Sequence, residues 1–503
     1  PLAGREYSVE RQDGSGSSWH RTETIFKVRG VANHSSTTGY RVNFVAPETV
    51  TTTLRGGTQL RQVLVYDDAA SDASCRATIT LCQGLVTTLK DQAGLGGDGD
   101  DTWTKTAYAK NTTNWIFVPK YVEVTDGPTP TTLLRCTRSY YDGAKLMNVT
   151  PTDGLLTATS TVVAPATTIG QCEDPGAALP TLSGISPIST YAVYDTFGNV
   201  VQSSIATTLA PENQAQGGAL GWIPPNTAYA VTGYDNIYHT YPTSVRNPTS
   251  ISTWLTTEYP QGDYDFVIGK PKKVILPNGA WQRTEYDSFG RMVQQWDDLD
   301  GDDIAGSNNL ATLKVTYDLA TRSVKVEKRI ESGQPYTSDA ITCFDGFGRE
   351  VDRIAENGSG FSRVRTDYDS RGLKAVQTNP FAGTALDCAS VTDLTSIRDR
   401  STFEYDPLGN ATKTYAKAAN ASSGPYTETI FNGLTTTYLD ENRHGRIEQR
   451  TLGTATTVGK LTVTEYRGVY GQTSGPDAWT SYATTTYEYD RLNQLTKVTD
   501  HFG

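Results

Sequence analysis

Histidine and cysteine are scarce in this chain, which has 5 His and 6 Cys among 503 residues. The histidines form no HxxxH or HExxH pattern, none clusters with cysteine, and no CxxC or G-x-S-x-G is present. These absences argue against zinc-ligand spacings, a thioredoxin-type site and a serine nucleophile turn. The five histidines are His20, His34, His239, His444 and His501. The sequence therefore predicts no catalytic, cofactor-binding or metal-ligating residue, and we expect a protein that is not an enzyme.

The cysteines are too sparse for a disulfide scaffold, and their pairing does not follow from the sequence. Cys75 and Cys82 flank a short strand-like run and would close a hairpin if bonded. Buried free thiols are the alternative interpretation. The other four are Cys136, Cys172, Cys343 and Cys388.

Long apolar runs and excess positive charge are also lacking. A membrane-spanning helix needs about 18–20 apolar residues, and the best candidate, residues 115–124, is interrupted by Pro119 and Lys120. The 44 Lys and Arg residues against 55 Asp and Glu give a net charge of −11, which argues against nucleic acid or an anionic membrane as partner. No leader-like segment follows Pro1, and the chain stops inside what looks like a repeat. We therefore expect a fragment of a longer chain.

Tyrosine and glycine, in contrast, are abundant. The chain has 28 Tyr, 46 Gly and 23 Pro, which makes it too aromatic for a disordered protein and too rich in turn residues for a helical one. Segments such as residues 402–405 and 484–489 alternate Thr or Glu with aromatic residues, a period of two that is typical of strands. No segment sustains a helical apolar pattern. The sequence predicts an all-β protein.

One short motif recurs along the chain. It consists of Tyr or Phe, then Asp, then Gly three residues after the Asp, then Arg or Asn. Good copies occupy residues 194–199, 286–291, 344–349 and 405–410, with their glycines at Gly198, Gly290, Gly348 and Gly409. Looser copies begin at Tyr66, Tyr141, Tyr234, Tyr317, Tyr368 and Tyr489. In the copy at Tyr489, Asn493 replaces the glycine, and in the copy at Tyr317, Thr321 does.

The motif predicts a β-hairpin. The Tyr ends a strand and packs on its neighbours, the Asp accepts backbone N–H groups of the turn, and the Gly supplies a positive φ. Because of that φ, we expect a Gly290→Val substitution to cost about 1 kcal/mol or more. A single hairpin cannot bury a face, so the hairpins must stack side by side.

These motifs resemble the RHS/YD-repeat family, which includes the B and C components of bacterial insecticidal toxin complexes, Rhs polymorphic toxins, wall-associated proteins and teneurins. The flanking residues agree, since Pro277-Asn278-Gly279 before the copy at Tyr286 resembles the family's Asn-Gly hairpin. The resemblance implies a β-hairpin sheet that spirals into a hollow shell, a cocoon. Residues 1–150 resemble the strand-rich region that precedes the repeats in B components, and residues 151–503 the repeat shell itself.

The resemblance also implies a function without a single site. We expect a structural shell segment of a secreted or cell-surface bacterial protein, whose partners are an enclosed C-terminal toxin or effector polypeptide and the remaining shell segments. The alternative is a teneurin-like or wall-associated adhesion protein that binds carbohydrate or protein. A glycosidase is a third interpretation, but no pair of carboxylates across a cleft can be identified from the sequence.

Three other segments invite a functional interpretation. Residues 94–99 match G-x-G-x-x-G, but without a leading strand or a following helix we expect an exposed acidic loop. Asp298, Asp300 and Asp302 alternate as in calcium loops, although a solvated insertion is the simpler interpretation. Residues 406–409, Asp-Pro-Leu-Gly, are similar to the motif near which Rhs-type shells cleave themselves; inside a repeat we expect an ordinary turn.

Overall fold

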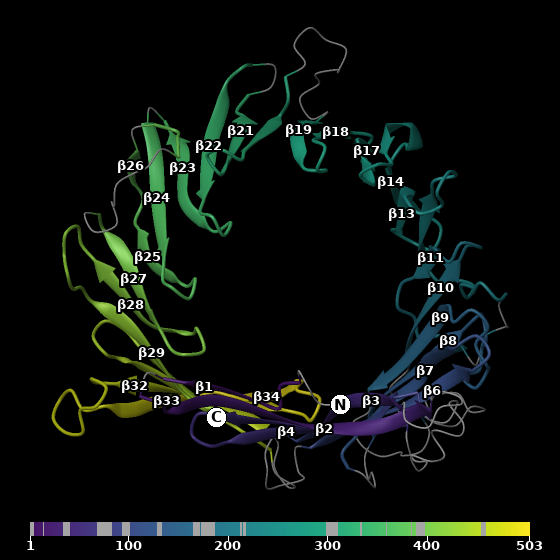
Figure 1. The fold of residues 1–503 in the computed structure, drawn as a ribbon, viewed down its shortest axis with the longest axis horizontal. Coiled ribbons are helices and arrows are strands. Elements are labelled where there is room, and N and C mark those ends of the chain that lie inside the picture. The colour runs from purple at the N-terminus through teal and green to yellow at the C-terminus, as the bar shows by residue number, and fades with distance from the viewer. Residues whose placement is uncertain are drawn as a thin grey trace. The chain divides into compact units, whose positions relative to one another are not determined.

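The computed structural model describes residues 5–13, 15–33, 41–67, 83–92, 101–127, 133–163, 172, 187–211, 214, 218–297, 310–331, 334–358, 360–383, 385–388, 398–453 and 459–502. In these residues the secondary structure consists of β-strands and one short 3-10 helix, η3 (Gln261–Asp263). The strands form successive antiparallel hairpins (Figure 1). The prediction of an all-β protein is confirmed.

The chain divides into two compact units. The first comprises Pro1–Thr227, Asp406–Asn410 and Glu428–Gly503, and the second Ala228–Tyr405 and Ala411–Thr427. The sequence-based boundary at residue 150 does not coincide with this division and stays a prediction.

In the first unit, each strand from β1 to β11 pairs antiparallel with the next along the chain, and so does each strand from β29 to β34. The strands are β1 (Ser8–Gln12), β2 (Ser18–Asn33), β3 (Arg41–Leu54), β4 (Gln59–Tyr66), β5 (Val86–Gln92), β6 (Thr102–Asn111), β7 (Ile116–Thr125), β8 (Leu133–Tyr141), β9 (Leu156–Val163), β10 (Ile188–Tyr194), β11 (Val200–Ser204), β29 (Tyr426–Asn432), β30 (Thr435–Leu439), β31 (Gly445–Thr451), β32 (Gly459–Arg467), β33 (Thr480–Tyr489) and β34 (Leu495–Thr499).

The second unit follows the same plan. Its strands are β12 (Tyr229–Tyr234), β13 (Pro242–Pro248), β14 (Trp254–Glu258), β15 (Tyr264–Asp265), β16 (Lys270–Pro271), β17 (Lys273–Ile275), β18 (Trp281–Tyr286), β19 (Met292–Asp297), β20 (Leu313–Asp318), β21 (Ser323–Arg329), β22 (Thr337–Phe344), β23 (Glu350–Asn357), β24 (Gly360–Tyr368), β25 (Lys374–Thr378), β26 (Phe381–Gly383), β27 (Arg400–Tyr405) and β28 (Ala411–Lys417). Strands β15 and β16 form a separate two-stranded ribbon, and β24 pairs with both β25 and β26.

The motif tyrosines mark where the ladder is interrupted. The register shifts by one residue at Tyr194, Tyr286, Tyr368 and Tyr405, and the same bulge occurs at Tyr66 and Tyr141 of the looser copies. A bulge bends the strand and re-aims its side chain. The Tyr therefore leaves the regular ladder at the point where each turn begins.

The first unit contains a small closed core. Tyr121, Leu133, Tyr140, Val162 and Tyr191 are each at most 8% exposed and pack together on β7 to β10. A disulfide joins Cys136 of β8 to Cys172, and the buried Arg138 donates from Nε to the Cys172 carbonyl at 3.2 Å. The segment at residue 172 is thereby fixed to one face of the sheet.

The second unit has almost no closed core. Among its described residues, the buried hydrophobic side chains are Val315, Ile341, Cys343 and Ile354. Most residues of its strands are only partly buried, on both faces. A sheet normally buries one face against another layer. The described sheet of this unit therefore buries few hydrophobic side chains on either face.

Two turns also connect distant strands of the first unit. Arg55, after β3, donates from Nη1 to the Phe431 carbonyl at 3.0 Å, and Arg491, after β33, donates from Nη1 to the Asp126 carbonyl at 3.1 Å. Gly433 lies so close to Arg55 that an added Cβ would come within 2.4 Å of the Arg55 carbonyl oxygen. Sheet edges in this protein can thus pack on each other through their turns.

Candidate functional site

The described residues contain no group of three or more His, Cys, Asp or Glu side chains arranged to hold a metal ion. His239 and His444 lie in separate turns, where their backbone N–H groups donate to Asp235 and Asp440, and His20 lies in β2. No helix in the described part of the chain is long and apolar enough to cross a membrane. His34, residues 94–99, the three aspartates Asp298, Asp300 and Asp302, and Cys75 with Cys82 lie outside the described residues.

The repeated feature with defined chemistry is the turn after each motif Tyr. In the turn at Asp345, one carboxylate oxygen accepts from the backbone N–H of Phe347 at 2.8 Å and from that of Arg349 at 3.0 Å. The other oxygen accepts from Nε of Arg349 at 2.7 Å. Equivalent bonds from two backbone N–H groups form at Asp195, Asp287, Asp369, Asp406, Asp440 and Asp490. We call these the Asp-capped turns.

The Asp-Pro-Leu-Gly segment is one of these turns. The Asp406 carboxylate accepts from the N–H groups of Leu408 and Asn410 and from the Asn410 side chain, each within 2.9 Å. Asp406 is 3% exposed and Gly409 has a φ of 91°. The prediction of an ordinary turn is confirmed.

A left-handed residue closes each Asp-capped turn. Gly290 and Gly348 have φ values of 73° and 78°. Asn493 has a φ of 59°, as the sequence predicted for the residue that replaces glycine. In the turn after Tyr317 the left-handed residue is Arg322, with a φ of 52°, and not Thr321. The ladder there continues to Asp318 opposite Ser323 without a bulge, so this turn places its left-handed residue one position later.

One turn offers a matched pair of glycines for testing the role of φ. Gly346 and Gly348 both face open space, but only Gly348 has a positive φ. We expect Gly348→Ala to lower the free energy of unfolding by about 1–2 kcal/mol, because L-residues are strained in this region. Gly346→Ala is the control and should leave the urea midpoint nearly unchanged. Equal midpoints for the two variants would contradict the turn assignment.

The motif Tyr connects one hairpin to the previous one. The hydroxyl of Tyr368, at the end of β24, donates at 2.7 Å to the carbonyl of Glu350, the first residue of β23. The hydroxyl of Tyr405 reaches the first carbonyl of β25, that of Lys374, at 2.8 Å. The same bond forms from Tyr66 to Pro47, Tyr108 to Val86, Tyr141 to Pro119, Tyr194 to Leu156 and Tyr286 to Pro271. The Tyr is therefore an interhairpin contact as well as a strand end.

The motif Arg makes a second connection, to the next hairpin. The guanidinium carbon of Arg349 lies 4.4 Å from the ring centre of Tyr368, and that of Arg291 lies 4.2 Å from Tyr317. Such cation–π contacts contribute about 0.5–1 kcal/mol at exposed sites. Since each Arg is also paired with the Asp of its own turn, the motif links neighbouring hairpins through an Asp–Arg–Tyr series.

In the turns at Asp345 and Asp369 the hydrogen bonds also lower the pKa of the carboxyl group. The backbone N–H of Arg349 has the largest effect and lowers the pKa of Asp345 below its ordinary value; burial opposes this, and the Arg349 side chain adds to it. In the next turn the backbone N–H of Leu373 is the main cause of a lowered pKa of Asp369. Hydrogen bonds to the charged form stabilise that form.

A pH dependence follows for Asp345. Because its folded pKa is lowered, the ionised carboxylate stabilises the folded state fully above its ordinary pKa of 3.8, and this contribution is lost as the pH falls below 3.8. We expect Asp345→Asn to lower the urea midpoint near neutral pH and to lose less stability than wild type on acidification. Glu331→Gln, at an exposed position outside the Asp-capped turns, is the control and should follow wild type at every pH. Parallel curves for wild type and Asp345→Asn would contradict the assignment.

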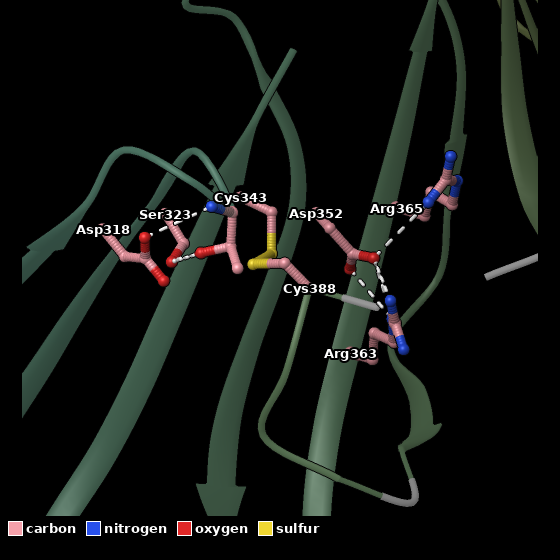
Figure 2. Close-up of a disulfide and its surroundings, with 8 residues drawn as sticks. Asp318, Ser323, Cys343, Asp352, Arg363, Arg365 and Cys388 are labelled. Carbon is pink, nitrogen blue, oxygen red and sulfur yellow. Dashed lines mark hydrogen bonds and ion pairs between the residues drawn. A yellow bond between two sulfur atoms is a disulfide. The ribbon is translucent and has the colours of Figure 1, made fainter. Parts of the chain in front are cut away.

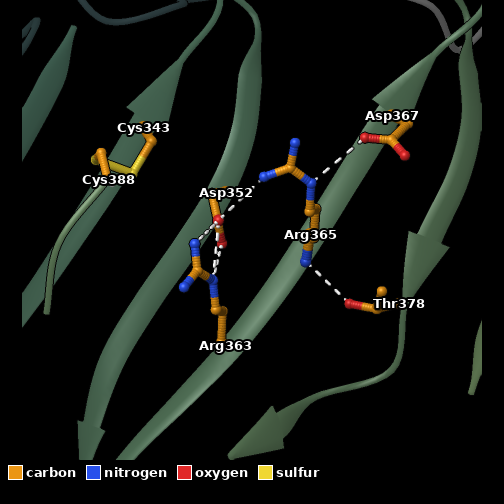
Figure 3. A network of polar contacts seen from close by, with 7 residues as sticks. All are labelled: Cys343, Asp352, Arg363, Arg365, Asp367, Thr378 and Cys388. Carbon is orange, nitrogen blue, oxygen red and sulfur yellow. Dashed lines mark hydrogen bonds and ion pairs between the residues drawn. A yellow bond between two sulfur atoms is a disulfide. The ribbon is translucent and has the colours of Figure 1, made fainter. Parts of the chain in front are cut away.

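A buried ion pair of the second unit lies beside its disulfide. Asp352 of β23 is 2% exposed, and Arg363 of β24 is 6% exposed. Nε of Arg363 donates to both Asp352 oxygens at 3.0 and 2.9 Å, and its Nη2 contacts the same carboxylate. Nη1 of Arg365 lies 3.5 Å from Asp352, so two guanidinium groups converge on one carboxylate (Figure 3).

The disulfide joins Cys343 of β22 to Cys388, in the segment that follows β26 (Figure 2). Cys343 lies opposite Asp352 in the β22–β23 ladder. The bond therefore ties the segment after β26 to β22, which pairs with β23, the strand that carries Asp352. The two disulfides, Cys136–Cys172 and Cys343–Cys388, give the pairing of four of the six cysteines, which did not follow from the sequence.

No protein-family model matches the chain, and no curated protein matches it. Solved structures do match. A crystal structure of TcdB2–TccC3–Cdc42 aligns with a TM-score of 0.65 at 13% identity over 96% of this chain and 30% of the matched one. The Tc holotoxin pore of Photorhabdus luminescens, with a mutated TccC3, aligns with a TM-score of 0.66 at 13% identity over the same shares.

These likenesses define the class of fold as that of a toxin-complex shell component. At 13% identity they show the fold alone. The chain spans about 30% of the length of the solved chains it matches. The expected all-β fold of successive antiparallel hairpins is therefore confirmed.

Proposed function

We propose that this chain is a structural segment of an RHS/YD-repeat shell, which encloses and shields a C-terminal toxin or effector polypeptide of a secreted bacterial protein. Its proposed partners are that polypeptide and the remaining shell segments. The proposed role needs no catalysis, because the sheet itself forms the functional surface. The likeness to toxin-complex structures supports this reading of the fold.

The observation that carries the proposal is the small number of buried hydrophobic side chains in the described sheet of the second unit. Among its described residues only Val315, Ile341, Cys343 and Ile354 are buried hydrophobics. A sheet with so small a core is suited to separate two compartments or to pack against another polypeptide.

The hairpin connections support the same role. Several Asp-capped turns are bonded to a neighbouring hairpin, either to the previous one through the Tyr, as at Tyr368, or to the next one through the Arg, as at Arg349. Stability then comes from neighbour-to-neighbour contacts along the sheet, as in repeat proteins, and not from a central core. Such a wall can extend without filling its interior.

The test is a low-resolution map of the full-length natural protein, combined with protease protection. We expect a closed wall around a large cavity, and a C-terminal polypeptide that resists protease until the wall is opened by denaturant. A solid interior, or a C-terminal region cleaved as fast in the intact protein as after unfolding, would overturn the proposal. Binding of carbohydrate or a cell-surface protein by a wall without cargo would favour the adhesion alternative.

A further inference from the structure

Three successive turns of the second unit enclose an apolar pocket. It lies at the ends of β18 to β23 and has a volume of about 220 Å³. Its lining consists of Tyr317, Leu319, Val324, Phe344 and Gly348 together with the polar residues Arg291, Asp318, Arg322, Ser323 and Asp345. The surface exposed in the pocket is mostly apolar, and the guanidinium group of Arg291 stacks on Tyr317 at 4.2 Å. The volume exceeds that of one benzyl side chain.

Exposed aromatic residues stand on both sides of this pocket. Phe289 is 77% exposed and Phe347 is 88% exposed, at the tips of the turns before and after the one that carries Leu319. Their positions are fixed, since each backbone N–H donates to the Asp of its turn, at 2.9 Å to Asp287 and 2.8 Å to Asp345. Each ring also lies 5.2 Å from the guanidinium carbon of its own motif Arg. Such exposure of large apolar side chains in a row marks an interaction surface.

The charges around the pocket are balanced. Arg291 pairs with Asp287 at 2.7 Å, and Arg349 pairs with Asp345 at 2.7 Å. The net charge of −11 would drive two copies of the chain apart, but this edge presents neutralised pairs. Asp318 and Arg322, which also line the pocket, carry opposite charges, so the lining has no net charge and favours a neutral aromatic group.

We propose that this edge is a self-association surface, on which Phe347 of each copy enters the pocket at Leu319 of a second copy. The pocket and the projecting ring lie in adjacent turns of one edge, so two edges that meet antiparallel can satisfy both contacts reciprocally, as a twofold interface requires. Edge packing through turns already occurs within the first unit, where Arg55 bonds to the Phe431 carbonyl. The inference rests on the geometry of the turns and is independent of the enclosure proposed above.

Sedimentation velocity of the 503-residue chain over a range of micromolar concentrations tests this proposal. We expect a concentration-dependent monomer–dimer equilibrium for wild type. Phe347→Ser removes the projecting ring, and Leu319→Arg places a charge at the pocket, where Leu319 is 77% exposed; both should remain monomeric. Val267→Ser changes a side chain that is 95% exposed on another turn and is the matched control, expected to dimerise like wild type.

A mixing experiment separates a specific contact from general stickiness. Phe347→Ser retains the pocket and Leu319→Arg retains the ring, so their equimolar mixture should form a heterodimer through the one intact contact. Circular dichroism spectra equal to wild type would show that both variants are folded. A wild-type chain that stays monomeric throughout, a mixture that does not associate, or a loss of dimer in Val267→Ser equal to that in Phe347→Ser would each overturn the proposal.

Discussion

Replacing Arg363 with Met should lower the free energy of unfolding by about 3 kcal/mol, because it leaves the buried Asp352 carboxylate with only the longer contact to Arg365. Removing one partner of a buried ion pair costs about 3–5 kcal/mol, and the remaining guanidinium group at 3.5 Å places this case at the lower end. The measurement is the urea-unfolding midpoint followed by tryptophan fluorescence.

The matched control removes both charges. In the double variant Asp352→Leu with Arg363→Met, no buried charge lacks its partner, so we expect most of the lost stability to return. A double variant as unstable as Arg363→Met would contradict the explanation through an unpaired carboxylate and would indicate a loss of packing instead.

Removing the Cys136–Cys172 disulfide should cost about 3–4 kcal/mol. The bond closes a loop with a sequence separation of 36 residues, and its loss frees the unfolded chain to explore more conformations. The folded state loses contacts too, since the disulfide holds Cys172 against the core at Arg138. We expect Cys136→Ala with Cys172→Ala to lower the free energy of unfolding by that amount, measured by urea unfolding.

Reduction provides the control for this prediction. A reducing agent should lower the midpoint of wild type, through Cys136–Cys172 and Cys343–Cys388 together, by more than that of the double variant. An unchanged midpoint for the double variant under oxidising conditions would show that the core around Tyr140 holds this region without the covalent bond.

The local part of the fold could be predicted from the sequence. The role of Asp in each turn and the left-handed position at Gly290 or Asn493 are encoded within six residues, so a motif suffices to find them. The looser copies were harder to recognise because insertions separate the Asp from its donors. Asp67 accepts from the N–H of Leu85, and Asp142 from that of Leu155, yet both make the same cap as the good copies.

The contacts between hairpins could not be predicted in the same way. The bond from Tyr368 to Glu350 and the stacking of Arg349 on Tyr368 depend on the register between strands. This register does not follow from the sequence, because the loops between the strands vary in length. The buried pair of Asp352 and Arg363 was not predicted from the sequence. Period-two reasoning places Arg363 and Arg365 on one face, but nothing in the sequence gives the burial of that face.

The Asp–Arg–Tyr series has a consequence for how such a chain can change in length. Because Arg349 contacts the Tyr of the next hairpin and Tyr368 bonds back to the previous one, a junction between two motifs that carry this Arg and this Tyr is made by the same pair of contacts. A whole hairpin can therefore be duplicated or deleted between two motifs, and the flanking hairpins would meet through an equivalent junction. Evolution can resize the wall in steps of one hairpin, while a gain or loss of a single strand would break the series.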